Sequence, residues 1–267
     1  MDLTGKVIIV TGAGTGLGRE MSLEFADRGA KVALSSNMPA EIEAVAAQCS
    51  QLGGGAIAVE ADVRDMASVE SMVQRVINEC GPVDVLVNNA GIGPGALAPT
   101  SNRRLVSELT VEQWEQMLNV NLIGTIRCTT AVLPSMIERG SGSIICLSSG
   151  TVRSPLAGMG PYTTSKSAIE MFVKVAALDL ADQGIRVNCI QPGGGVDTAL
   201  VPPDFPTEMR SQLHHPSVMR KCASWLASDD SHMVTGRSFA AMEWNKERGL
   251  VECPCENCRA PVGSAEP

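Results

Sequence analysis

The feature that most constrains the fold is an alternation of short apolar runs with longer segments of helical pattern. The runs are apolar at consecutive positions, which is typical of parallel strands covered by helices on both faces. Alternating strands and helices favour right-handed βαβ units. The sequence therefore predicts an α/β fold, a doubly wound parallel sheet of about seven strands flanked by helices.

The predicted strands are Val7–Val10, Val32–Leu34, Ala56–Val59, Val83–Val87, Ile144–Leu147, Arg186–Ile190 and Phe239–Trp244. The predicted helices are Leu17–Arg28, Ala40–Leu52, Ala67–Glu79, Val111–Glu138, Tyr162–Gln183 and Ser217–Ala227. No linker interrupts this rhythm, so residues 1–249 are expected to form one domain. Residues 250–267 contain Cys and Pro without periodicity, and we expect a tail there.

Composition excludes several classes of protein. A net charge of -8 and an aromatic content of 3% argue against nucleic-acid partners, which require a basic face and stacking platforms. Apolar runs fall short of a membrane span, and the N-terminus lacks a signal-peptide pattern, so no membrane partner is expected. The nine cysteines are odd in number and six are scattered singly, which indicates reduced thiols and a cytoplasmic location.

The tail holds three close cysteines, Cys253, Cys255 and Cys258. Three thiols could ligate a soft metal with a fourth donor from elsewhere. No second pair of cysteines or run of histidines accompanies them, so the sequence predicts no metal site.

A glycine-rich segment, Thr11–Gly18, follows the first strand and opens the first helix. Glycines let the backbone approach a pyrophosphate, and the N-terminus of the helix supplies N–H donors and a positive dipole. An ordinary strand-to-helix connection is the alternative, but the position of the segment favours dinucleotide binding. The cofactor contacts predicted here are Gly12, Thr15, Gly16, Leu17 and Gly18.

Five further motifs follow in order along the chain. They are Asn88–Gly91 (NNAG), Asn119–Gly124 (NVNLIG), Ser148-Ser149, Tyr162–Lys166 (YTTSK) and Pro192-Gly193. Over roughly residues 3–240 the chain resembles the short-chain dehydrogenase/reductase family, whose domain is Rossmann-like. The resemblance implies an NAD(P)-dependent oxidoreductase.

Tyr162 and Lys166 are one helical turn apart, so both side chains project from one face of a helix. Tyr162 is the only tyrosine in the chain. A phenol has a pKa near 10, and a neighbouring ammonium stabilises phenolate, which brings proton exchange toward neutral pH. The pair therefore predicts general acid–base catalysis by Tyr162.

The resemblance implies roles for the other catalytic residues. Ser149 would hydrogen-bond the substrate oxygen, and its neighbour Ser148 is the alternative. Asn121 matches the asparagine that holds a water in a proton relay through Lys166, whereas Asn119 is expected to be structural. Lys166 would also bind the nicotinamide ribose.

The remaining cofactor contacts are implied by the resemblance as well. They are Asp62 and Val63 at the adenine, Asn89, Ala90 and Gly91 after the fourth strand, Pro192 and Gly193 near the nicotinamide, and Thr198 at its carboxamide. Asp62 could instead cap a helix. Thr198 comes one residue later than the family spacing, which leaves its role open.

The end of the second strand bears on the choice of cofactor. Ser36 stands where an NAD-binding aspartate would lie, and Ser36 and Asn37 could donate to a 2′-phosphate. Thr15 occupies a place where many NADP-binding relatives carry a cation, and Arg19 is a possible substitute. The missing acid predicts a modest preference for NADP(H), with NAD(H) as the alternative.

Two loops are expected to border the substrate entrance. Arg103 and Arg104 lie in one of them, and His214 and His215 lie in the other. These side chains could contact substrate, although exposed loop residues are the simpler interpretation.

The predicted function is interconversion of a small-molecule ketone and a secondary alcohol. A non-redox NAD(P)-bound regulator or an epimerase on the same scaffold is the alternative. The family's long helices, here those holding Asn121 and Tyr162, pair between subunits, so a homotetramer or homodimer is expected.

Overall fold

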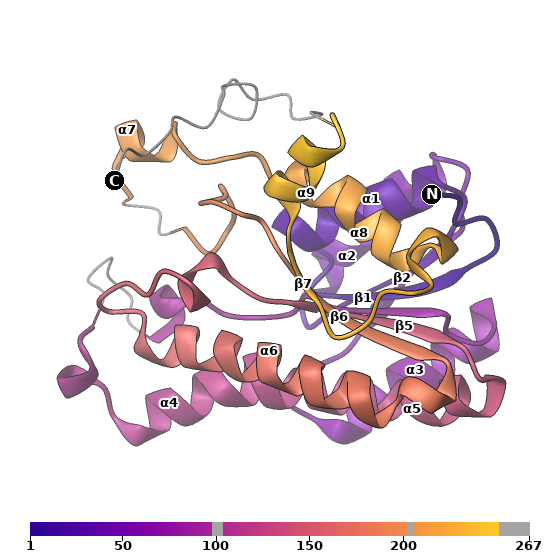
Figure 1. The fold of residues 1–267 in the computed structure, drawn as a ribbon, viewed down its shortest axis with the longest axis horizontal. Coiled ribbons are helices and arrows are strands. Elements are labelled where there is room, and N and C mark those ends of the chain that lie inside the picture. Colours follow the sequence, from indigo (N-terminus) through magenta and orange to yellow (C-terminus); the bar gives the residue numbers. More distant parts are fainter. Residues whose placement is uncertain (98–103, 202–204, 251–267) are drawn as a thin grey trace.

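The computed structural model describes residues 1–97, 104–201 and 205–250. Its centre is a sheet of seven strands in the order β3-β2-β1-β4-β5-β6-β7, with every neighbouring pair parallel (Figure 1). The strands are β1 (Val7–Thr11), β2 (Lys31–Ser36), β3 (Ala56–Glu60), β4 (Val85–Asn88), β5 (Gly142–Leu147), β6 (Ile185–Gln191) and β7 (Ser238–Ala240). This confirms the predicted fold class.

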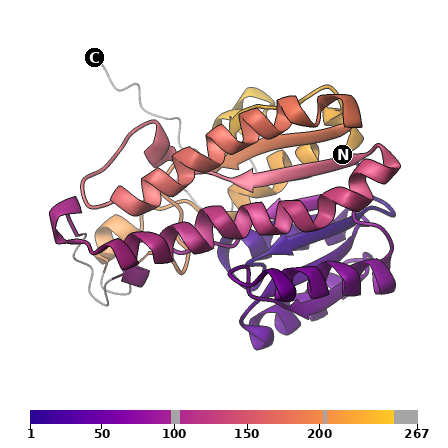
Figure 2. The same cartoon turned by 90° about the horizontal axis from the view of Figure 1, so that it is seen from below.

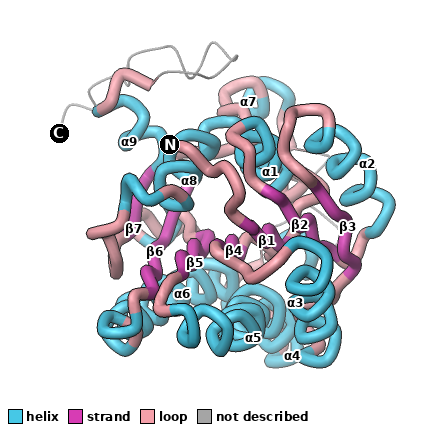
Figure 3. Tube along the Cα trace, turned by 90° about the vertical axis from the view of Figure 1, so that its right-hand side faces the viewer, coloured by secondary structure: helices cyan, strands magenta, loops and turns pink. Residues whose placement is uncertain are grey.

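Helices cover both faces of the sheet (Figure 3). One face carries α1 (Gly16–Asp27), α2 (Pro39–Ser50), α8 (Arg220–Ala227) and α9 (Ala241–Glu247). The other carries α3 (Met66–Cys80), α5 (Gly124–Arg139) and α6 (Gly160–Asp179). Two further helices, α4 (Val111–Leu118) and the short α7 (Thr207–Arg210), lie toward one end of the strands (Figure 1).

Each layer has its own apolar core. Phe25 of α1 and Leu34 of β2 are fully buried in one core, and Val76 of α3 and Met136 of α5 are fully buried in the other. The strands are apolar at consecutive positions because both of their faces are covered in this way.

The predicted helix Val111–Glu138 is continuous but not uniform. A π-helical segment, Asn119–Ile123, joins α4 to α5. By length and composition the span Val111–Arg139 could cross a membrane. It is a core helix of this domain, because Cys128 and Val132 are fully buried against the sheet and the helix runs beside α6 (Figure 2).

The prediction of a strand over Phe239–Trp244 is wrong in its second half. The strand ends at Ala240, and α9 begins at Ala241. Trp244 packs in the core from this helix, with its ring 5.3 Å from that of Trp225. A short apolar run is compatible with either a strand or a buried helix. Here the residues after Ala240 include good helix formers, and they form α9.

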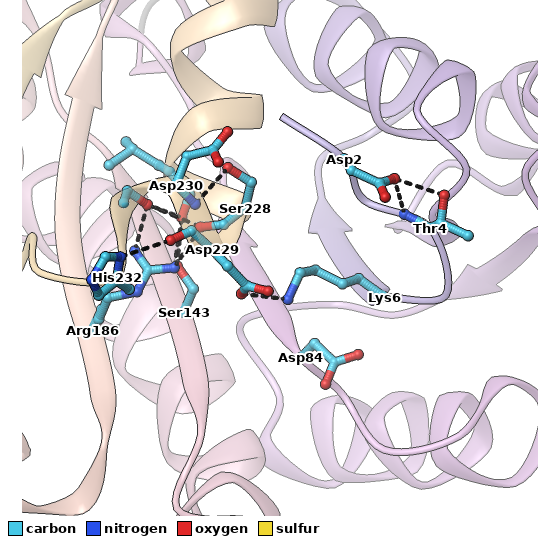
Figure 4. A network of polar contacts seen from close by, with 12 residues as sticks. Asp2, Thr4, Lys6, Asp84, Ser143, Arg186, Ser228, Asp229, Asp230 and His232 are labelled. Carbon is cyan, nitrogen blue, oxygen red and sulfur yellow. Dashed lines mark hydrogen bonds and ion pairs between the residues drawn. The ribbon is translucent and has the colours of Figure 1, made fainter.

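The amino ends of the strands are held by polar contacts (Figure 4). Arg186 at the start of β6 donates to the Ser231 hydroxyl at 2.9 Å and to the Leu226 carbonyl at 3.0 Å. Lys6, before β1, pairs with Asp229 at 2.8 Å. These contacts fasten the turn after α8 to the sheet.

The chain is described as far as Leu250, whose N–H donates to the Asn245 carbonyl at 2.8 Å and whose side chain packs against the core. Cys253, Cys255 and Cys258 lie outside the described residues. Within the part of the chain that the structure describes, no group of three or more His, Cys, Asp or Glu could hold a metal.

Candidate active site

A cavity of about 360 Å³ opens at the carboxyl ends of the strands. It lies where the strand order reverses between β1 and β4, which is where open α/β sheets bind ligands. Most of the predicted cofactor contacts line it: Gly12, Thr15, Gly16, Leu17, Ser36, Asn37, Asp62, Val63, Asn89, Ala90, Gly91, Tyr162, Lys166 and Thr198.

The turn after β1 is packed so closely that two of its positions accept only glycine. Gly12 has a φ of 62°, and a Cβ there would lie 2.9 Å from the Ala90 Cα. A Cβ on Gly18 would lie 2.3 Å from the Gly12 carbonyl oxygen. The close packing brings the N-terminus of α1 to the cavity, where its unpaired N–H groups favour an anion.

Hydrogen bonds join this turn to the turn after β4. The Asn89 amide donates to the carbonyls of Thr11 and Gly12 at 2.9 and 2.8 Å. The Thr11 hydroxyl accepts from the N–H groups of Asn89 and Ala90 at 3.1 and 3.0 Å. The two loops that border the cavity are therefore held as one unit.

Tyr162 and Lys166 project from α6 into the wall of the cavity. Ser149 lies near the Tyr162 phenol and acts to lower its pKa. Lys166 is buried, donates to the Leu147 carbonyl at 2.8 Å, and holds its Nζ 5.8 Å from the centroid of the Tyr162 ring. Asn121 lies close by, because its Oδ1 and the Lys166 Nζ both lie within 3.7 Å of a Cβ built on Gly91.

Burial shifts both proton-bearing groups. It raises the pKa of Tyr162, against a smaller lowering from Ser149. It lowers the pKa of Lys166 to about 8. For Tyr162 this direction is opposite to the lowering predicted from the neighbouring ammonium, because desolvation by burial is the largest effect on the phenol.

The two serines after β5 point in different directions, as alternate residues of an extended segment do. Ser148 donates to the Glu170 carboxylate at 2.7 Å, away from the phenol. Ser149 lies near Tyr162 and also accepts a hydrogen bond from the Thr151 hydroxyl at 3.0 Å. Ser148 lines the cavity and Ser149 does not, but Ser149 is the one of the two that affects the pKa of the Tyr162 phenol.

Asn121 lies in the π-helical segment and is completely buried. Its Oδ1 accepts from the Ile92 N–H at 2.8 Å, and its Nδ2 donates to the Ile92 carbonyl at 3.1 Å. The side chain therefore fixes the loop after β4, and π-segments are frequent at functional sites for such reasons. Asn119 accepts from Arg127 at 2.9 Å, which is a structural contact.

Pro192 and Gly193 are not among the residues that line the cavity. The Pro192 carbonyl accepts from the Met242 N–H at 3.0 Å, and the Gly193 N–H donates to the Gln191 side chain at 2.8 Å. Both residues therefore pack toward α9. Thr198 does line the cavity, and its methyl carbon would lie 3.2 Å from a Cβ built on Gly16.

The sequence interpretation missed two charged residues that line the cavity, Glu41 and Arg64. Glu41 lies in the first turn of α2, five residues after Ser36, whereas the NAD-binding acid was expected at the end of β2. Arg64 pairs with Asp62 at 2.6 Å. This contact holds the pKa of the Asp62 carboxyl below its usual value.

A small apolar hollow adjoins Tyr162 on its other side. Its lining includes Leu97, Leu109, Met117 and Met159, together with Arg104. Arg103 lies outside the described residues.

The two loop histidines have structural contacts. Burial lowers the pKa of His214, which forms a bridge with Val196. His215 accepts from the Ser217 N–H at 3.2 Å at the start of a short helix.

A doubly wound sheet with a glycine-rich turn at its switch point defines a dinucleotide-binding α/β protein. The family model described as short chain dehydrogenase matches residues 6–208. The chain belongs to the short-chain dehydrogenase/reductase family, and so to a family of oxidoreductases.

Relatives of known activity cover most of the chain. A 2,5-dichloro-2,5-cyclohexadiene-1,4-diol dehydrogenase from Sphingobium indicum is 35% identical over 88% of this chain and 93% of its own length. A 2,3-dihydro-2,3-dihydroxybenzoate dehydrogenase from Bacillus subtilis is 35% identical over 72% and 70%. A short-chain dehydrogenase/reductase structure from Mycobacterium marinum has a TM-score of 0.81 at 28% identity and covers 89% of this chain and 94% of its own.

Proposed function

We propose that this protein interconverts a ketone and a secondary alcohol in an NAD(P)(H)-dependent reaction, with Tyr162 as general acid and base. The observation that supports this most directly is the pair at the wall of the cavity, Tyr162 and the buried Lys166, whose Nζ lies 5.8 Å from the centroid of the Tyr162 ring. Proton transfer by a positioned side chain contributes about 10²–10⁴ in rate.

The residues at the switch point fit a dinucleotide. The glycines let the turn after β1 pack closely against the turn after β4, and the start of α1 offers N–H groups to a pyrophosphate. Ser35, which lines the adenosine half of the cavity, has a buried hydroxyl without a hydrogen-bond partner in the described part of the chain. A buried hydroxyl of this kind favours a polar ligand, because leaving it unpaired costs about 1–3 kcal/mol.

The nicotinamide, when bound, supplies or accepts the hydride. Tyr162 donates its phenolic proton to the carbonyl oxygen during reduction and takes a proton from the alcohol during oxidation. Ser149 donates to the same oxygen and fixes its position. Lys166, anchored on the Leu147 carbonyl, keeps a positive charge beside the developing phenolate.

The hollow beside Tyr162 has a volume of only about 10 Å³, so it supports a substrate class through the chemistry of its lining and not through its size. Its side chains are mostly apolar, with Leu97, Met117 and Met159 among them. Two relatives act on cyclic diols by their names. Compact, largely apolar cyclic alcohols are therefore the first compounds to assay.

The test is a panel of cyclic and linear secondary alcohols and their ketones, followed by reduced-nicotinamide absorbance. We expect turnover with at least one alcohol–ketone pair. Cofactor binding without turnover of any pair would favour a regulator. Substrate conversion without net change in absorbance would favour an epimerase.

We further propose a homotetramer or homodimer in the cytoplasm. Three apolar side chains of α6, Met171, Val175 and Leu178, are at least half exposed in the single chain. The six cysteines of the described residues are free thiols, as expected for a reducing compartment.

A further inference from the structure

The adenosine end of the cavity contains a carboxylate that the strand-end pattern does not reveal. Glu41, at the third position of α2, lines the cavity together with Gly14, Ser36 and Asn37. A Cβ built on Gly14 would lie 2.8 Å from Glu41 Oε2, so the carboxylate rests against the glycine-rich turn. Gly14 is the residue that leaves room for it.

Glu41 is half-buried, and no ion pair or hydrogen bond of its carboxylate occurs among residues 1–97, 104–201 and 205–250. A carboxylate in the first turn of a helix is favoured by the helix dipole, which accounts for an acid at this position. The dipole does not account for its place in the cavity wall. There it is available to accept hydrogen bonds from ribose hydroxyls.

The cations at this end of the cavity are already engaged. Arg64 is bound to both carboxylate oxygens of Asp62 at 2.6–3.0 Å. Arg19, which the sequence offered as a phosphate ligand, donates to Glu20 and to Gln48. With Glu41 and Asp62 negative and Arg64 positive, the charges lining this end sum to minus one.

Ser36 is also less available than the sequence suggests. Its hydroxyl oxygen accepts from the Met38 N–H at 3.1 Å, which stabilises the turn between β2 and α2. The hydroxyl oxygen is therefore part of that turn, and the neutral donors Ser36 and Asn37 do not balance a neighbouring carboxylate. A 2′-phosphate placed here would meet net repulsion.

We propose that Glu41 selects NAD(H) over NADP(H) by accepting hydrogen bonds from the adenosine ribose and repelling a 2′-phosphate. The inference rests on the proposed dinucleotide-dependent function and reverses the cofactor preference predicted from Ser36. Specificity of this kind comes from a repulsive group as much as from an attractive one.

The test measures binding, without any substrate. Dissociation constants for NADH and NADPH are determined by fluorescence or calorimetry for the full chain. Those for 5′-ADP and adenosine 2′,5′-bisphosphate are determined in the same way. We expect the wild type to bind NADH at least about tenfold more tightly than NADPH, and this ratio to shrink at high salt, which screens the repulsion.

Glu41→Gln keeps the shape of the side chain and removes its charge. We expect it to narrow the NADH-to-NADPH ratio about tenfold, mainly through tighter NADPH binding. The matched control is Glu43→Gln, which makes the same change of charge at an exposed position of the same helix and should leave the ratio unchanged.

Three results would overturn the inference: equal or tighter binding of NADPH by the wild type, an unchanged ratio in Glu41→Gln, or an equal response in Glu43→Gln. Failure of the proposed function has a different signature, since neither dinucleotide would then bind to any variant.

Discussion

At the scale of single residues, the proposed chemistry depends on the Tyr162 phenol, whose pKa is raised by burial. We expect Tyr162→Phe to lower the rate of the chemical step by about 10²–10⁴ while the dinucleotide affinity changes only a few fold, because the ring remains and only the proton donor is lost. Single-turnover rates and dissociation constants measured on the same preparation test this. Retention of more than a tenth of the wild-type rate would refute the role.

The raised pKa of Tyr162 also determines how the rates of alcohol oxidation and ketone reduction depend on pH. A raised pKa leaves Tyr162 protonated at neutral pH, so the phenol can donate to a ketone but cannot accept a proton from an alcohol. The rate constant for alcohol oxidation should therefore rise steadily up to at least about pH 10, whereas that for ketone reduction should stay level over this range and fall only above the raised pKa.

Initial rates in both directions at saturating cofactor and substrate measure these profiles. The residual activity of Tyr162→Phe serves as the control, since its oxidation rate should lack the rise with pH. An oxidation rate that is flat between neutral and alkaline pH would contradict the assignment of Tyr162 as the base.

At the scale of elements, α1 is positioned by charged contacts on its outer face. Glu20 has a side chain that is 4% exposed and pairs with Arg220 of α8 at 2.6 Å. Arg220→Ala leaves this buried carboxylate with Arg19 alone, and we expect a loss of about 1–3 kcal/mol in the free energy of unfolding. Denaturant-induced unfolding measures it.

The control is Arg75→Ala on α3, where both members of the pair with Glu79 are about half exposed. Such surface pairs contribute about 0.3–0.5 kcal/mol. Equal losses in the two variants would show that burial of Glu20 does not strengthen its pair.

Some elements of the fold could be predicted from the sequence and others could not. The strand interiors and the glycine-rich turn were predictable, because they follow from consecutive apolar residues and from the close approach at Gly12 and Gly18. The end of β7 was not, since the period of a short apolar run does not separate a strand from a buried helix. Tyr162 and Lys166 could be paired from their spacing alone.

Other parts of the site depend on tertiary packing. The π-helical segment at Asn121 has no local signature, and its purpose is visible only in the bonds to Ile92. Glu41 belongs to a helix that follows the strand end, and its carboxylate reaches the glycine-rich turn only because α2 packs beside α1. The pKa of Tyr162 is raised because the phenol is buried, and the burial of a single side chain could not be predicted from the sequence.

At the scale of the whole molecule, one face of the single chain remains apolar. On α6 the side chains of Met171, Val175 and Leu178 are 58%, 50% and 78% exposed. Their spacing of four and then three residues places them in one stripe along the helix. A stripe of this kind is stabilised when a second copy covers it, because apolar area leaves water.

We therefore expect the purified protein to have a mass of two or four chains of 28.0 kDa by light scattering. The double variant Val175→Glu and Leu178→Glu should shift the mass toward one chain, since the assembly would have to bury four carboxylates at each two-fold contact. Circular dichroism distinguishes this from unfolding.

Leu52→Glu is the matched control, because Leu52 is 41% exposed and follows α2 on the opposite face of the sheet. It adds one negative charge, against two in the double variant, to a chain that already carries -8, so a general effect of charge would move the mass of both variants in the same direction. A monomeric wild type, or an assembly that survives both glutamates, would place the contact between copies away from α6. With the control unchanged and the double variant dissociated, α6 would be identified as the surface that joins the subunits.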